Sequence, residues 1–344
     1  MDIKVNGSRL KNLLSYDWVK ILVSIIAGIV VWTLLFTTLA TRATVGEEFF
    51  FVVYNNVSSE SASTSNSYLS KLKKDGVLSY DVLDAQVSRI QSAGQYSASY
   101  MLSLRMSVQE GDVLLISDGR AVQVEENEDE KESENDPTQE IATVINGGYL
   151  YKFEDFLADA RDYCVSNGFI IENQDGTYAV DEQVIETYFR TVRLKSAGNY
   201  RKTFRSELQK QEGVKLEIKR IVSVYENYLF VKKAIDQAKA SGNDVLWYGD
   251  TYKFDEDGKP IESSKQTFAY GIDLYKLNKP FIESATDKKP NLADTWFTYA
   301  NGKTTSEGLV LSVFNFKKYQ PDMQYEALAV VKDFIKTYSG YGHV

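Results

Sequence analysis

The sequence has almost none of the side chains that most hydrolytic and metal-dependent chemistry requires. Among its 344 residues there is one histidine, His343, and one cysteine, Cys164. A histidine so close to the last residue is poorly placed for a Ser-His-Asp triad, and these two residues cannot form a His/Cys metal cluster. We therefore expect no enzyme, no metal and no cofactor. Chemistry that uses carboxylates alone stays open, although no motif points to it.

Positive charge is also scarce. The 39 lysines and arginines are outnumbered by 48 acidic residues, which gives a net charge of −9. Such a chain offers no basic patch to a phosphate backbone, so we expect no nucleic-acid partner. One cysteine excludes an intrachain disulfide, and a large domain has core enough to fold without one. Aromatic residues are 13% of the sequence, which is typical of a folded domain rather than a disordered stalk.

One long apolar run is present. Residues 21–40 read ILVSIIAGIVVWTLLFTTLA and include no charged residue. A helix of this length spans about 30 Å, the thickness of the hydrocarbon core of a bilayer. The hydroxyl side chains in the run can bond to carbonyls of the preceding turn, so they do not oppose insertion. We therefore predict a single transmembrane helix and the membrane itself as a partner.

The residues on either side of this run predict its orientation. The N-terminal side carries four basic residues against two acidic ones, whereas the C-terminal side soon becomes acidic. A basic excess marks the cytoplasmic side, so the protein is predicted to be a cell-membrane, single-pass protein with an extracellular C-terminal domain. The alternative is a cleaved signal peptide, with Thr38 and Ala40 as the small residues before the cut. The length of the apolar run favours an uncleaved anchor.

Beyond the anchor, apolar runs and turn residues alternate in the order strand, helix, strand, helix, strand. Strands are predicted at 47–56, 77–83 and 113–117, and helices at 67–75 and 85–108. This alternation predicts a parallel sheet with right-handed crossovers. Residues 125–136 follow as an acidic, solvated loop. A calcium site there is the alternative, but the run lacks the glycine of an EF-hand loop.

The middle of the chain is predicted to be helical. Phe153, Phe156, Leu157 and Ala160 lie on one face of a helix, and Cys164 extends that face as a buried apolar residue rather than a reactive thiol. A strand edge and a short helix follow at 177–191, then a basic and exposed segment at 193–211 and a long amphipathic helix at 216–240. The remaining predicted elements are strands at 244–249, 267–274 and 309–314, a charged hairpin at 252–265, and a closing helix at 324–338.

Three segments resemble one protein family. SYMLSLRMSVQEGDVLLIS (residues 99–117) is similar to the second helix and third strand of type-two extracytoplasmic solute-binding proteins, the sugar-binding subunits of ABC importers. In that family a helix ends at a glycine, here Gly111, and Asp-Val opens the strand. GGYLYKFEDFLADA resembles the entry into the family's second lobe, and GLVLSVFNFKKYQPDMQYEALAVVKDFI resembles the strand and helix that rejoin the first. The chain departs from the family in its spanning helix and its short second lobe.

The resemblance implies an α/β fold, with an N-terminal transmembrane helix followed by a two-lobed periplasmic-binding-protein-like domain. The domains are then a cytoplasmic N-terminus at 1–20, the transmembrane helix at 21–40, a discontinuous first lobe at 45–118 and 243–344, an acidic flexible loop at 119–139, and a mainly helical second lobe at 140–242. The central test of this arrangement is that strand 309–314 shares a sheet with strand 113–117.

Ligands of parallel sheets lie beyond the C-terminal ends of the strands, and aromatic faces stack on sugars. The candidate ligand-binding residues are Tyr54, Asn55, Asn56, Ser117, Asp118, Trp247, Tyr248, Trp296 and Tyr299. For the aromatic residues inside a strand, a place in the core is the plainer alternative.

The first functional hypothesis is a membrane-anchored module that binds a sugar or another small polar solute in a cleft between the lobes, with an ABC permease or another envelope protein as partner. The second is a tethered protein-interaction module without a small ligand, in which the basic segment 193–211 and the acidic loop 125–136 are partner surfaces.

Overall fold

The computed structural model describes residues 18–39, 43, 47–54, 66–90, 97–119, 137–196, 198–278, 307–317, 325–339 and 341. The chain divides into two units, residues 1–42 and residues 43–344.

The first unit contains helix α2, Trp18–Leu39. Among the described residues it is the one helix long and apolar enough to cross a membrane, and none of its apolar stretch is buried against protein. The hydroxyl of Thr33 donates to the carbonyl of Ile29 at 2.8 Å, as predicted for hydroxyl side chains in this run. The predicted N-terminal apolar helix is therefore confirmed as a helix.

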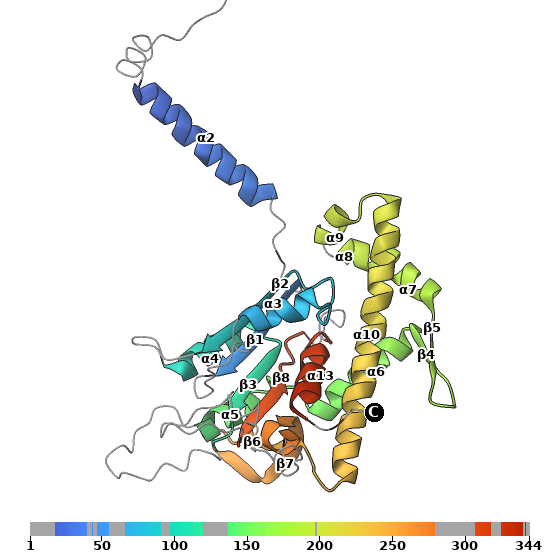
Figure 1. The fold of residues 1–344 in the computed structure, drawn as a ribbon. Helices are drawn as coiled ribbons and strands as arrows, with labels where there is room; N and C mark the ends of the chain where they lie inside the picture. The colour runs from blue at the N-terminus through green and yellow to red at the C-terminus, as the bar shows by residue number, and fades with distance from the viewer. Residues whose placement is uncertain are drawn as a thin grey trace, which may run out of the picture. The chain divides into compact units, whose positions relative to one another are not determined.

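A six-stranded mixed sheet is the centre of residues 43–344, in the order β2-β1-β3-β8-β7-β6 (Figure 1). Its strands are β1 Glu48–Tyr54, β2 Asp84–Ile90, β3 Val113–Ser117, β6 Leu246–Phe254, β7 Pro260–Asp273 and β8 Leu309–Val313. β1 pairs in parallel with β2 and with β3, whereas β8 pairs antiparallel with β3 and places Val313 opposite Val113. The prediction that strand 309–314 shares a sheet with strand 113–117 is confirmed.

The second predicted strand is wrong, and the helix predicted at 85–108 is wrong in its first part but confirmed in its last, where α4 Ala98–Val108 forms. Residues 77–83 form turns, and residues 84–90, predicted as the start of a helix, are strand β2. The three-residue spacing of Val87 and Ile90 fits one face of a helix, but in a strand it puts them on opposite faces. Each face is covered by a different apolar cluster, Val87 by one and Ile90 by the other, so both positions are apolar for separate reasons.

Helices cover both faces of the sheet. On one face lie α3 Asn66–Lys74, α6 Phe153–Ser166, α10 Glu207–Ala240 and α13 Ala327–Tyr338; on the other lie α4 Ala98–Val108 and α5 Pro137–Asn146 (Figure 1). The side chains of β1 alternate between the two apolar clusters, with Phe51 in the first and Val52 in the second. β3 is buried on both faces, which explains its uninterrupted apolar sequence VLLIS.

The helical segment packs directly onto the sheet. Phe156 and Ile221 of the predicted second lobe share one apolar cluster with Phe51 and Val113 of the first. The predicted buried face of α6 is confirmed and includes Cys164. Residues 43–344 are therefore one compact α/β unit with a mixed sheet.

A smaller group of elements precedes and surrounds the start of α10. It comprises the hairpin β4 Ile170–Glu172 and β5 Tyr178–Val180, then α7 Glu182–Tyr188, the π-helix η3 Phe189–Arg193, α8 Leu194–Ser196 and α9 Gly198–Thr203. The prediction that 193–211 is exposed is wrong at four described positions, because Arg193, Asn199, Tyr200 and Phe204 are buried. Ser206 and Gln209 form a capping box that starts α10.

Candidate functional site

The parallel strands end at one edge of the sheet, and several segments meet there. The chain leaves β1 for β2 on one side and returns to β3 on the other, so the carboxyl ends of β1 and β3 form a topological switch point. Each of β8, β7 and β6 runs antiparallel to its neighbour, so β6 begins at the edge where β3 ends. Helix α5 packs against β3 and β6.

A hollow of about 520 Å³ opens at this edge, which is within the size range of small-ligand sites. Its lining comes from the end of β3, from α5, from β6 and from the segment after β7. The lining residues are Asp118, Ile141, Ala142, Ile145, Asn146, Trp247, Tyr248, Gly249, Asp250, Tyr252 and Lys276.

Trp247 forms the base of the hollow and is tied to the end of β3. Its indole Nε1 donates to Asp118 Oδ2 at 2.7 Å, and both residues are buried. Gly249 lies beside the indole: a Cβ there would be 2.9 Å from the Trp247 ring and 2.5 Å from Ile145 Cδ1. Trp247 is buried, so most of its ring is covered by the core. The hydrogen bond to Asp118 holds the ring in this position.

The rim of the hollow is polar and held in place by hydrogen bonds. The Tyr248 hydroxyl donates to Asp244 Oδ2 at 2.8 Å, and partial burial together with this carboxylate raises the pKa of Tyr248 to about 12. The backbone N–H of Tyr252 donates to Asn146 Oδ1 at 3.1 Å. Asp250 pairs with Lys265 at 2.8 Å, and the hydrogen bond from Lys265 lowers the pKa of Asp250.

The structure brings together three of the predicted site residues, Asp118, Trp247 and Tyr248. Tyr54 and Ser117 are buried and do not line the hollow. Asn55, Asn56, Trp296 and Tyr299 lie outside the described residues.

Sequence reasoning missed Asn146, Asp250, Tyr252 and Lys276. Tyr248, Asp250 and Tyr252 alternate along β6, so a strand prediction that reached residue 254 would have found two of them.

Asp112 of the family-like Gly-Asp-Val segment has a structural role. Its carboxylate pairs with Lys317 Nζ at 2.6 Å and accepts the backbone N–H of Phe50 at 2.8 Å. Complete burial outweighs these contacts and raises the pKa of Asp112. It precedes β3, at the edge opposite the hollow, so it joins the start of β3 to β1.

A network of buried charges lies on the other side of the sheet, where α10 meets the turn before β2 and η3. Its members are Asp81, Arg193, Glu217 and Arg220, all nearly or fully buried. Arg193 lies 2.7 Å from Asp81 and 3.5 Å from Glu217, and Arg220 lies 2.7 Å from Glu217. Burial would raise the pKa of Glu217, but the charges of Arg220 and Arg193 outweigh it and lower that pKa. The network therefore locks α10 to the turn and to η3.

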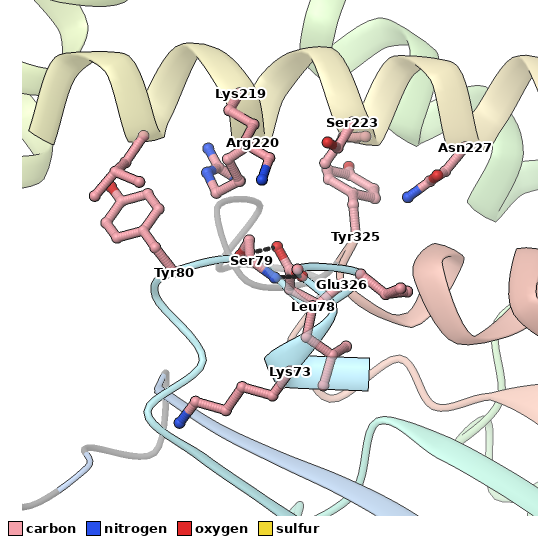
Figure 2. A pocket seen from close by; sticks show the side chains of 14 residues that line it. Lys73, Leu78, Ser79, Tyr80, Lys219, Arg220, Ser223, Asn227, Tyr325 and Glu326 are labelled. Carbon is pink, nitrogen blue, oxygen red and sulfur yellow. Dashed lines mark hydrogen bonds between the residues drawn. The ribbon is translucent and has the colours of Figure 1, made fainter. Parts of the chain in front are cut away.

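Tyrosine hydroxyls complete this network. Tyr80 donates to Glu217 Oε2 at 2.7 Å, and Arg193 and Arg220 donate to Tyr200 at 2.9 Å and to Tyr163 at 2.5 Å. A second cavity, of about 220 Å³, lies beside the network under α10 (Figure 2).

Reactive and metal-binding groups are few in the described part of the chain. Burial raises the pKa of the Cys164 thiol to about 12, so it is unreactive at neutral pH. Among the described residues, no group of three or more His, Cys, Asp or Glu side chains is placed to hold a metal ion.

No protein family, no curated protein and no solved structure matches the chain. The resemblance to solute-binding proteins therefore rests on the three segments quoted above.

Proposed function

We propose that this protein is a membrane-anchored, extracytoplasmic binding module that takes a small polar solute in the hollow beyond the carboxyl end of β3. The observation that carries the proposal is the place of this hollow: Asp118, directly after the carboxyl end of β3, lines it, and open α/β sheets bind ligands beyond the carboxyl ends of their strands.

The chemistry of the lining selects a neutral, hydroxyl-rich solute such as a sugar. Asp118 and Asp250 supply carboxylate oxygens, which accept hydrogen bonds from hydroxyl groups. Tyr248 is 43% exposed and offers a ring face to the C–H surface of a sugar. Asp118 and Asp250 line the hollow with Lys276, and Lys265 pairs with Asp250 beside it, so the charges at the hollow balance, which suits a neutral solute.

The finer parts of the proposal concern the lobes and the anchor. The hollow has walls from β6, in the proposed first lobe, and from α5, which begins the proposed second lobe 140–242 and packs directly on the sheet of the first. Helix α2 is proposed to cross the membrane with residues 1–20 in the cytoplasm, because the side of a membrane helix that has an excess of basic residues faces the cytoplasm. An ABC permease or another envelope protein is the proposed partner.

A thermal-shift screen tests the solute proposal. The full-length chain in detergent micelles is heated with a panel of neutral mono- and disaccharides. A ligand at 100 times its Kd stabilises the fold by about 2.7 kcal/mol, which raises the melting temperature by several degrees. A panel in which no sugar shifts the melting temperature opposes sugar binding.

A second candidate function is a tethered protein-interaction module. The observation that favours it is an exposed apolar stripe on α4 formed by Tyr100, Leu104 and Val108, at four-residue spacing. Exposed apolar surfaces of this kind often mark protein contacts. A photo-crosslinking residue at position 104 in living cells should then join one discrete envelope protein, whereas a residue at the polar position 103 should not.

A further inference from the structure

The cavity under α10 has an unusual lining on its helix side. Lys219, Ser223 and Asn227 occur at four-residue spacing along α10, and Figure 2 shows them above Ser79 and Glu326. Lys219 Nζ lies at the Gly76 wall, where a Cβ on Gly76 would be 3.3 Å away from it. The cavity holds about seven water volumes, which is room for a molecule of a few heavy atoms.

These three side chains have hydrogen-bond donors to spare. Asn227 uses its Oδ1 to accept from Lys332 at 2.8 Å, which leaves the amide N–H groups for the cavity. Within the described part of the chain, Lys219 Nζ and the Ser223 hydroxyl make no hydrogen bond. A cation, a hydroxyl and an amide NH₂ in one row form a set that suits an anion with several acceptor oxygens.

The opposite wall contains a buried carboxyl group, that of Glu326. Ser79 Oγ lies 2.6 Å from Glu326 Oε1 and also contacts Asp81 Oδ1. The backbone N–H of Ser79 also donates to Glu326 Oε2 at 3.1 Å. Asp81 is paired with Arg193, whereas no ion pair joins Glu326 to a cation among the described residues. Burial of a carboxyl group without a paired cation favours its neutral form, so of the two groups Glu326 is the one that holds a proton more readily.

The surroundings of Glu326 agree with this assignment. Burial, and after it the charge of Asp81, raise the pKa of Glu326 to about 7. The titratable and charged side chains that line the cavity with it or act on its charge are Lys73 on α3, Tyr80 and Asp81 on the turn, Lys219 and Arg220 on α10, and its neighbour Tyr325. Behind them, Arg193, Glu217 and Tyr163 contact Asp81 or Arg220. With Glu326 neutral, the carboxylates of Asp81 and Glu217 balance Arg193 and Arg220, so Lys73 and Lys219 leave the cavity with a net positive charge.

We propose that this cavity is a second ligand site, which binds a small carboxylate such as lactate on Lys219, Ser223 and Asn227 while Glu326 is protonated. An ionised Glu326 on the opposite wall would repel the bound anion. At a pH at which Glu326 is ionised in the free protein, Glu326 must therefore take up a proton when lactate binds. This site is independent of the proposed sugar site, with which it shares no lining residue.

Isothermal titration of lactate into the full-length chain in detergent tests the proposal. Between pH 6 and pH 8.5 the neutral fraction of Glu326 falls from about 90% to about 3%, so the affinity should fall about 30-fold. Titration at pH 8 in buffers of different ionisation enthalpy should show uptake of about 0.9 proton per lactate. This second measurement needs no variant. A lack of saturable binding at pH 6, or binding without proton uptake at pH 8, would overturn the proposal.

Variants assign the site to these residues. Lys219→Met should weaken lactate binding at least tenfold, whereas the exposed Lys215→Met on the same helix should leave it unchanged. Glu326→Gln, which stays neutral, should bind lactate with the same affinity at pH 6 and pH 8.5. An equal loss of lactate affinity in both lysine variants would contradict the assignment. So would a folded Glu326→Gln protein whose lactate affinity depends on pH as in the wild type.

Discussion

Replacing Glu217 by glutamine should strongly destabilise residues 43–344. Glu217 is fully buried; its Oε1 lies 2.7 Å from Arg220 and 3.5 Å from Arg193, and its Oε2 accepts from Tyr80. Glutamine keeps the size of the side chain but removes its charge, so the two guanidinium groups share Asp81 alone. Breaking a buried ion pair from one side costs about 3–5 kcal/mol, because an uncompensated charge stays buried.

Urea unfolding of the full-length chain in detergent measures this loss. With an m-value of about 3 kcal/mol/M, the midpoint should fall by roughly 1 to 1.7 M. The matched control is Asp236→Asn on the same helix, which removes a 2.9 Å ion pair with Lys232 whose side chains are 53% and 61% exposed. An exposed pair of this kind contributes less than about 1 kcal/mol. If Glu217→Gln unfolds at the same urea concentration as Asp236→Asn, the network does not hold α10 in place.

Three further predictions concern the anchor, the sheet and Glu326. Protease added to intact cells or protoplasts should degrade the C-terminal domain and leave a small membrane-bound fragment; a mature N-terminus at Thr41 would instead show a cleaved signal peptide. Gly271→Ala should destabilise the domain by roughly 1–3 kcal/mol in thermal unfolding, because the new Cβ would lie 2.4 Å from the Leu311 carbonyl oxygen of the neighbouring strand, and an unchanged melting temperature would contradict that packing. The raised pKa of Glu326 means that the folded state binds more protons than the unfolded state between pH 4.5 and about 7, so this group makes stability fall as pH rises through that window. Relative to Glu326→Gln, the free energy of unfolding of the wild type should fall by about 3 kcal/mol across this pH window. Curves of stability against pH that stay parallel for the two proteins would refute the assignment.

Local patterns predicted much of the fold because they depend on near neighbours in the sequence. β3 was predicted at its observed bounds, and the buried face of α6 followed from apolar residues at helical spacing. β2 was missed because its apolar residues serve opposite faces of the sheet, and pairing with β1 decides its conformation. Helix propensity and spacing contain no information about that partner.

The sites show the same division between local and distant information. The rule for strand ends placed Asp118 at the hollow, but Asn146 and Lys276 reach it from segments that only the tertiary fold brings near. Arg193 was predicted to be exposed because its segment is basic and polar. Its burial depends on Asp81, 112 residues away, which no local pattern reveals.

The most direct test of solute binding is a comparison of two variants that each fill one hollow. Ala142→Trp places an indole in the hollow beside Trp247 and leaves Asp118 in place, whereas Ala158→Trp fills a separate hollow of about 440 Å³ between α6 and α10. Each protein is titrated calorimetrically with the neutral sugars. The proposal predicts saturable binding of at least one sugar to the wild type and to Ala158→Trp, and none to a folded Ala142→Trp. A sugar that binds all three proteins with equal affinity, or a wild type that binds no sugar, would contradict it.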